Sequence, residues 1–142
     1  MSLLPAKPVL TIEASKAVAA AVLEKAASMQ IPVSVAVVDD GGSLMYFERT
    51  MDTSLASVRA AVGKAFTSVY WKNDSMFLQT AINDRGFPNL LGLTFATPLA
   101  GGLPLVANGH VVGAVGVSGG SLAQDQEMGQ AGPEAFAKFL EG

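Results

Sequence analysis

The alternation of apolar and polar positions in the last third of the chain predicts a β-hairpin followed by a helix. Residues 103–107 form the first predicted strand, Asn108-Gly109 the turn, and residues 110–118 the returning strand. Asn-Gly suits a type I′ turn, because both central residues of that turn need positive φ. After Gly119-Gly120, Ser121 and Gln124 match a capping box, which predicts a helix from residue 121 to about 140.

The returning strand has two unlike faces, because successive side chains of a strand point to opposite sides of the sheet. One face carries valines: Val111, Val115 and Val117. The other face carries side chains that become smaller toward its end: His110, Val112, Ala114, Gly116 and Ser118. Small side chains predict that something bulky, either a packed helix or a ligand, approaches this second face closely.

The first third of the chain predicts a helix and two paired strands. The helix covers residues 11–29, is rich in alanine, and begins at Thr11 as N-cap. Residues 33–38 are apolar on both faces, which is typical of a central strand covered on two sides. A turn at residues 39–42 leads to a strand over residues 43–49, which places Arg49 at the end of a strand.

A second helix is predicted over residues 54–71. Its apolar stripe consists of Leu55, Val58, Val62, Ala65 and Val69. The opposite face holds mostly small side chains: Ser57, Ala60, Ala61, Lys64, Thr67, Ser68 and Trp71. A solvated face normally carries several charges, so we expect the single lysine, Lys64, to line a cleft or a subunit interface, with an ordinary exposed lysine as the alternative.

The middle of the chain predicts less regular structure. A short helix follows Asn73-Asp74-Ser75 and runs through residue 83, with Met76, Phe77 and Thr80 on its inner side. Residues 84–92 read as a loop, and residues 93–99 as a short strand or extended segment that enters the Gly101-Gly102 turn.

Composition indicates one domain over residues 1–142 that hides part of its surface in a homo-oligomer. Half of the residues are hydrophobic and 15% are charged, against about 25% charged in a typical domain. The net charge of −3 and the absence of a basic stripe argue against nucleic acid as a partner. No apolar run is long enough for a membrane span and no signal peptide is visible, so we expect a cytoplasmic protein.

Residue types also exclude several kinds of site. The chain has no cysteine and one histidine, His110. Thiolate chemistry and cysteine-metal sites are therefore absent, and neither a zinc-binding spacing nor a serine nucleophile elbow is present. The sequence accordingly predicts no metal and no resident cofactor.

Several segments together resemble the GlcG/HbpS family, also called the haem-degrading or DUF336 domain. They are the alanine-rich first helix, VSVAVVDDGGSLMYFERT, the helix with Lys64-Ala65, GGLPLVANGHVVGAVGVSGG, and the acidic helix start at Asp125. The resemblance covers residues 10–132. It implies an α+β fold of the profilin or PAS type, with a central antiparallel sheet of about five strands flanked by helices, and it implies homo-oligomers.

The resemblance implies two kinds of function, haem binding or a part in the catabolism of small molecules. Haem needs an axial ligand, usually His, Met, Tyr or Cys, and a histidine in the first helix is implicated in haem-binding relatives. Residues 10–30 contain no histidine here, and His110 lies beside a hairpin turn. The segment Arg49-Thr50-Met51-Asp52 also departs from the family pattern, because it is one residue longer and lacks a glycine.

The first hypothesis is a metal-free enzyme that acts on a small carboxylate-bearing metabolite from ring cleavage, by tautomerisation or by hydrolysis of an imine or enamine. Arg49 would bind the carboxylate and Lys64, with a lowered pKa, would carry a proton or form an imine. Asp125 would be the general acid/base. The residues expected to line the substrate cavity are Gly101, Gly102, Ser118 and Glu127, the last also a substitute for Asp125.

Two other hypotheses remain open. One is a non-catalytic module that binds haem or a metabolite in the same cleft. The other is purely structural, with Lys64 and Arg49 pairing with Asp125 or Glu127 across a subunit interface.

Overall fold

The computed structural model describes residues 3–142. Its elements, in chain order, are α1 (Ile12–Met29), β1 (Ser34–Asp39), β2 (Leu44–Arg49), α2 (Leu55–Trp71), α3 (Met76–Asp84), the 3₁₀ helix η1 (Pro88–Gly92), β3 (Gly102–Ala107), β4 (His110–Ser118) and α4 (Leu122–Leu140). The strands form one antiparallel sheet with the order β2-β1-β4-β3. The architecture is therefore the predicted α+β fold, with four strands in place of about five.

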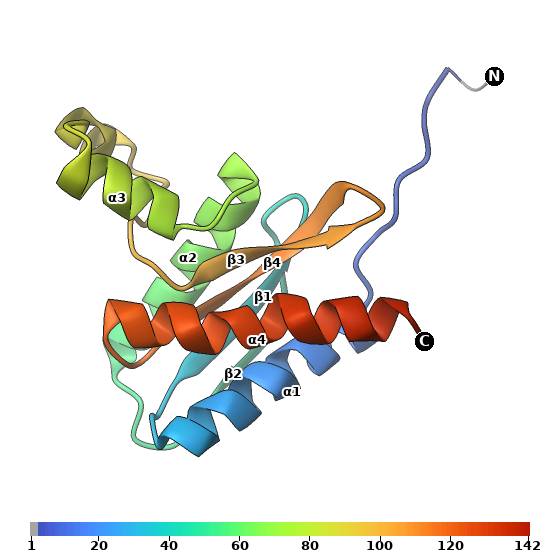
Figure 1. Cartoon of the computed structure of the whole chain (residues 1–142), viewed down its shortest axis with the longest axis horizontal. Coiled ribbons are helices and arrows are strands. Elements are labelled where there is room, and N and C mark those ends of the chain that lie inside the picture. The colour runs from blue at the N-terminus through green and yellow to red at the C-terminus, as the bar shows by residue number, and fades with distance from the viewer. Residues whose placement is uncertain (1–2) are drawn as a thin grey trace.

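Helices cover both faces of this sheet (Figure 1). Helices α1 and α4 pack side by side on one face, α2 lies on the other, and α3 with η1 projects beyond the sheet. None of the helices within residues 3–142 is long and apolar enough to cross a membrane.

The central position predicted for residues 33–38 is confirmed, because β1 lies between β2 and β4 and is buried along nearly its whole length. Val35 and Val37 belong to the core beneath α1 and α4, whereas Val38 packs with Ala65 of α2. Both faces of the strand are thus apolar because each of them is covered by a helix.

The hairpin and the helix that follows it are also confirmed. Asn108 and Gly109 have φ of 51° and 79°, as a type I′ turn requires. Ser121 and Gln124 form both hydrogen bonds of the capping box at the start of α4. Thr11 likewise caps α1, since its hydroxyl accepts a hydrogen bond from the Ala14 amide.

The predicted alternation along β4 is wrong near its start. The register between β3 and β4 shifts between Leu105 and Val106, and this irregularity exchanges the two faces. Val112 therefore joins the core beneath α1 and α4, while Val111 lines a surface hollow beside Lys72. Farther along, a Cβ atom on Gly116 would overlap the backbone carbonyl of Ala61, so a packed helix is what approaches the small side chains.

The apolar stripe predicted along α2 faces the sheet only in part, since Ala65 and Val69 are buried there. Leu55, which begins the apolar stripe, is 79% exposed, and the side that faces the sheet carries Ser57, Ala61, Lys64, Ala65 and Ser68. The helix lies so close to the sheet at Gly116 that large side chains have no room there. The hydroxyls of Ser57 and Ser34 instead form a buried hydrogen bond of 2.8 Å.

The middle segment differs from prediction in two ways. The buried residues of α3 are Leu78 and Ala81, whereas Met76 and Phe77 are 40% and 37% exposed. Of the two alternatives predicted for residues 93–99, the strand is wrong, since the segment is irregular with a turn at residues 94–95. The Thr97 amide donates a hydrogen bond to the Thr67 hydroxyl of α2, which holds this segment against a helix and away from a strand partner.

Candidate functional site

The side chain of Lys64 extends from α2 into the interior of the molecule, toward the end of β4. Its Nζ atom donates hydrogen bonds to the backbone carbonyl of Val117 at 2.9 Å and to Oδ2 of Asp125 at 2.7 Å. The side chains of Lys64 and Asp125 are only 1% and 2% exposed. The alternatives of an exposed or a cleft-lining lysine are therefore wrong, and Lys64 forms the hypothesised pairing with Asp125 within one chain.

Asp125 is fixed by both of its carboxylate oxygens. It lies in the first turn of α4, where the positive end of the helix dipole favours a negative charge. While Oδ2 accepts from Lys64, Oδ1 accepts a hydrogen bond of 2.8 Å from the amide of Gly120. The ion pair therefore ties together α2, the end of β4 and the start of α4.

Burial makes the charged form of Lys64 less favourable than it is in water. Desolvation lowers the pKa of Lys64, and the hydrogen bond and negative charge of Asp125 oppose that shift. Removing an ammonium group from water is costly, so the pair is stable only because each charge is neutralised and hydrogen-bonded.

Gly101 and Gly102 pack directly on Lys64. A Cβ atom on Gly102 would overlap the backbone carbonyl of Lys64, and one on Gly101 would lie 3.1 Å from its Cδ atom. Gly101 also has φ of +124°, a conformation that favours glycine. The two glycines thus let the chain pass close to the lysine, and at these contacts there is no space for a substrate.

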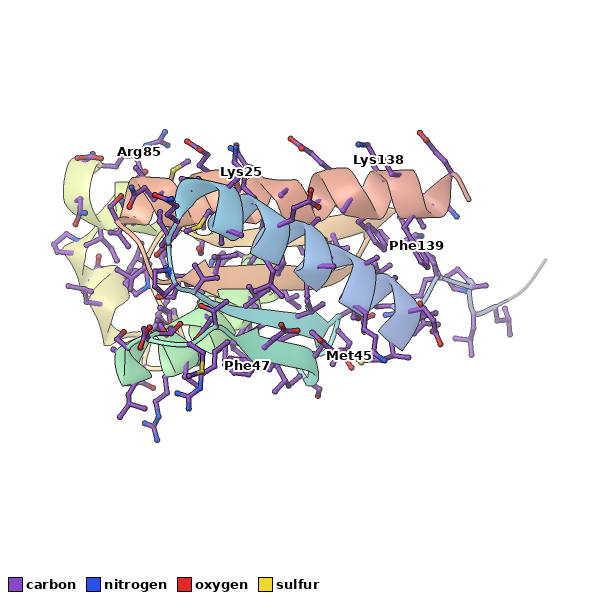
Figure 2. All side chains as sticks on the ribbon, turned by 90° about the horizontal axis from the view of Figure 1, so that it is seen from below. Lys25, Met45, Phe47, Arg85, Lys138 and Phe139 are labelled. Carbon is purple, nitrogen blue, oxygen red and sulfur yellow. The ribbon has the colours of Figure 1, made fainter. Side chains whose placement is uncertain are left out.

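Arg49 and Glu127 lie apart from this pair, whereas Ser118 directly follows Val117, whose carbonyl accepts a hydrogen bond from Lys64. Arg49 is exposed at the end of β2 and borders a hollow of about 320 Å³ formed by residues 49–53. Ser118 is half-buried at the end of β4, opposite Ser34 in the register. Glu127 is 56% exposed and pairs with Lys25 of α1 at 3.6 Å; Figure 2 labels Lys25 where α1 and α4 meet. The structure therefore unites Lys64 with Asp125 and leaves Arg49 and Glu127 outside.

A polar network beside the pair was missed by the sequence analysis. Gln126 accepts a hydrogen bond from the Gly101 amide at 3.0 Å and donates one of 2.9 Å to Oδ2 of Asp74. The hydroxyl of Ser75 accepts from the amide of Gly102 at 2.8 Å. The sequence signal for this network was the pair Gly101-Gly102. Backbone amides at the start of a buried strand need hydrogen-bond acceptors, and here Gln126 and Ser75 provide them.

His110 borders a different hollow, of about 230 Å³, at the start of β4. Lys7, Asp40 and Lys72 contribute its charged groups, and Lys7 forms an ion pair with Asp40. Val69 and Val111 are its apolar residues. Across residues 3–142, no group of three or more histidine or acidic side chains is placed to hold a metal ion.

Comparison with known proteins identifies the family. A family model described as haem degrading protein HbpS-like matches residues 10–134. The chain belongs to the HbpS-like family. The chain is also similar to Protein GlcG of Escherichia coli K12. The two are 32% identical over a region that covers 79% of this chain and 83% of Protein GlcG.

Two solved structures resemble this HbpS-like chain over most of its length. Klebsiella pneumoniae ORFY has 31% identity and a TM-score of 0.88, covering 96% of this chain and 97% of its own. The PduOC–heme complex has 28% identity and a TM-score of 0.84, covering 90% and 95%. The fold predicted from the sequence is thus the fold of experimentally determined relatives.

Proposed function

We propose that this chain is a non-catalytic binding protein for a small carboxylate-bearing molecule, which it holds through Arg49. The observation that carries the proposal is the contrast between two cations. Lys64 is sealed from solvent and neutralised by Asp125, whereas Arg49 is exposed beside a hollow and forms no ion pair with any of residues 3–142. A guanidinium can bind a carboxylate with two parallel hydrogen bonds.

The start of α2 adds positive potential near Arg49 and opposes the negative charge of Asp52, which lines the same hollow. The hollow formed by residues 49–53 immediately precedes α2, whose N-cap residue Ser54 makes no side-chain capping hydrogen bond. The first turn of α2 contains no acidic residue. Uncapped amides at a helix N-terminus carry partial positive charge, which adds to the attraction of Arg49 for a carboxylate.

The same geometry does not support acid–base catalysis by Lys64 and Asp125. A catalytic group must come within hydrogen-bond distance of the proton that it transfers. Both side chains are nearly fully buried and each is already hydrogen-bonded to the other. Within the proposal, this pair shapes the fold, and tautomerisation or imine hydrolysis is not part of the function.

Titration calorimetry against small unsaturated dicarboxylates and semialdehydes tests the proposal. We expect a ligand that loses about tenfold in affinity when Arg49→Gln removes the charge, which corresponds to about 1.4 kcal/mol. Arg59→Gln is the matched control, because Arg59 is an exposed arginine outside the hollow. Equal affinities for the two variants would contradict the role of Arg49.

The same samples should be examined for product by NMR. We expect each bound compound to remain chemically unchanged. Turnover that survives in Arg49→Gln but disappears in a folded Lys64→Met variant would overturn the binding-only proposal and restore the enzyme hypothesis.

Haem binding is a second candidate, favoured by the PduOC–heme relative and by the hollow at His110. There the imidazole of His110 would be the axial ligand, and Lys72, which has no ion pair within residues 3–142, would be the partner of a propionate. Arg49 would not take part. In the sheet, Arg49 lies opposite Ser34, and Ser34 lies opposite Ser118 at the end of β4. Eight residues separate Ser118 from His110, which is about 26 Å at a rise of 3.3 Å per residue.

A haemin titration followed by visible absorption tests this candidate. Haem bound through the imidazole gives a Soret band that is lost in His110→Ala and retained in Arg49→Gln. A band that persists in His110→Ala would contradict ligation by His110, and no band at all would contradict haem binding.

A further inference from the structure

Helix α3 has an apolar side that the rest of the fold covers only in part. Its buried residues, Leu78 and Ala81, lie toward the body of the protein. Met76 and Phe77 are 40% and 37% exposed and border a hollow of about 300 Å³. The polar residues around the same hollow are Asn73, Asp74, Thr80 and Arg85.

The hollow has opposite charges at its two ends. Asp74 precedes α3 and Arg85 is its C-cap, so the whole helix lies between them. Eleven residues at 1.5 Å each separate their backbones by about 16 Å along the helix axis. Figure 2 shows Arg85 at the end of the molecule where α3 projects. Within residues 3–142, neither Asp74 nor Arg85 takes part in an ion pair.

The carboxylate of Asp74 is held in place by a buried residue. Its Oδ2 atom accepts a hydrogen bond of 2.9 Å from Gln126, which is 7% exposed and is itself fixed by the Gly101 amide. No hydrogen bond within the described chain engages Oδ1 of Asp74. A fixed carboxylate with one uncommitted oxygen is suited to bind an ammonium group.

We propose that this hollow binds an extended zwitterion, of which an ω-amino acid is the simplest example. The ammonium group pairs with Asp74, the carboxylate pairs with Arg85, and the methylene chain lies on Met76 and Phe77. An α-amino acid is too short for this arrangement, because its two charges are only two bonds apart. The volume of about 300 Å³ is at the lower end of the range for ligand sites, which suits a small molecule.

This site is independent of the proposed carboxylate site at Arg49. The two hollows share no residue, since one is formed by residues 49–53 and the other by residues 73–85. A ligand at the α3 hollow is recognised by both signs of charge, whereas a ligand at Arg49 is recognised by its carboxylate alone.

Titration calorimetry of the full chain with 6-aminohexanoate tests the inference. Hexanoate, hexylamine and leucine are the comparison ligands, because the first two lack one charge and the third has its charges too close together. We expect measurable binding of 6-aminohexanoate at low salt, at least tenfold weaker binding of each comparison ligand, and a loss of affinity in 0.5 M NaCl through screening. Equal affinities for 6-aminohexanoate and hexanoate, or no binding of 6-aminohexanoate, would overturn the inference.

Variants identify which residues bind the ligand. Arg85→Gln and Asp74→Asn should each weaken 6-aminohexanoate about tenfold, and the asparagine retains an oxygen that can accept from Gln126. Arg59→Gln, which removes an arginine outside the hollow, should leave the affinity unchanged. Thermal melts confirm that all three variants are folded. Unchanged affinity in folded Arg85→Gln and Asp74→Asn would place the ligand elsewhere and overturn the inference.

Discussion

Lys64 and Arg49 are both cations near one end of the sheet, but they lie in opposite environments. Lys64 has 1% of its side chain exposed and a carboxylate partner at 2.7 Å, whereas Arg49 is exposed at the end of an edge strand. Charge interactions are strong in the interior and are weakened by water and salt at the surface. The difference teaches that the buried cation serves the fold, while the exposed one is available for a ligand.

The largest expected effect comes from breaking the buried pair. Lys64→Ala leaves Asp125 charged, buried and without its cation, so we expect a loss of about 3–5 kcal/mol in the free energy of unfolding. Urea denaturation measures it. Lys64→Met combined with Asp125→Leu removes both charges and should recover most of the loss. A single variant that loses less than about 1 kcal/mol would show that Lys64 is not sealed as described.

A smaller effect is expected from disturbing the contact that seals α2 onto the sheet. Gly116→Ala forces a methyl group against the backbone of Ala61, which should cost about 1–3 kcal/mol of unfolding free energy. Gly92→Ala is the control, because a Cβ atom there meets nothing within 4 Å. Similar thermal stabilities for the two variants would mean that the helix can move away from the sheet.

The pH dependence of stability gives a third test. Because burial lowers the pKa of Lys64, the folded protein binds fewer protons than the unfolded chain between that lowered pKa and 10.5. Stability contributed by this group must therefore rise with pH in that window, by at most about 1.4 kcal/mol per pH unit. The unfolding free energy is measured across this pH range for the wild type and for the variant with both Lys64→Met and Asp125→Leu. The difference between the two proteins at each pH isolates the contribution of the pair. A difference that falls as the pH approaches 10.5 would contradict the direction of the shift.

The smallest effect on stability is expected at the exposed cation. Arg49→Gln should change the unfolding free energy by no more than about 0.5 kcal/mol, since Arg49 has no buried partner to leave behind. Urea denaturation in the absence of ligand checks this value. A loss above 1 kcal/mol would show that Arg49 supports the fold and would remove the contrast with Lys64.

Local sequence signals were enough to predict much of the fold. The Asn108-Gly109 turn, the Ser121 capping box and the Thr11 N-cap each depend on residues within a few positions of one another. The doubly apolar strand β1 was recognisable because a central strand needs apolar side chains on both faces.

Features that depend on distant contacts were not predictable in the same way. The sheet-facing side of α2 is the side with small residues, because Gly116 of β4 brings the two backbones together. Periodicity alone favoured the side with the larger apolar residues, beginning with Leu55. The exchange of faces at Val111 and Val112 follows from a register irregularity that alternation cannot reveal.

The candidate site was predicted only in part for the same reason. Lys64 was noticed for its unusual local setting and Asp125 through the resemblance to a known family, but 61 positions separate them, and their contact depends on the packing of α2, β4 and α4. Whether Arg49 binds a ligand is still a prediction, although its position outside the buried pair is settled by the fold. Residue types indicated which groups were unusual, and the tertiary structure determined which of them meet.

The order of the strands has a consequence for how copies of this chain can associate. The outer strands are β2 and β3, and a row of free backbone groups on such strands invites pairing with another sheet. Pro104 lies within β3 and lacks an amide hydrogen, while Glu48 and Arg49 place charges at the end of β2. Proline and charged side chains on the outer strands oppose the addition of a foreign strand, so extension of the sheet is a disfavoured way for copies of this chain to associate.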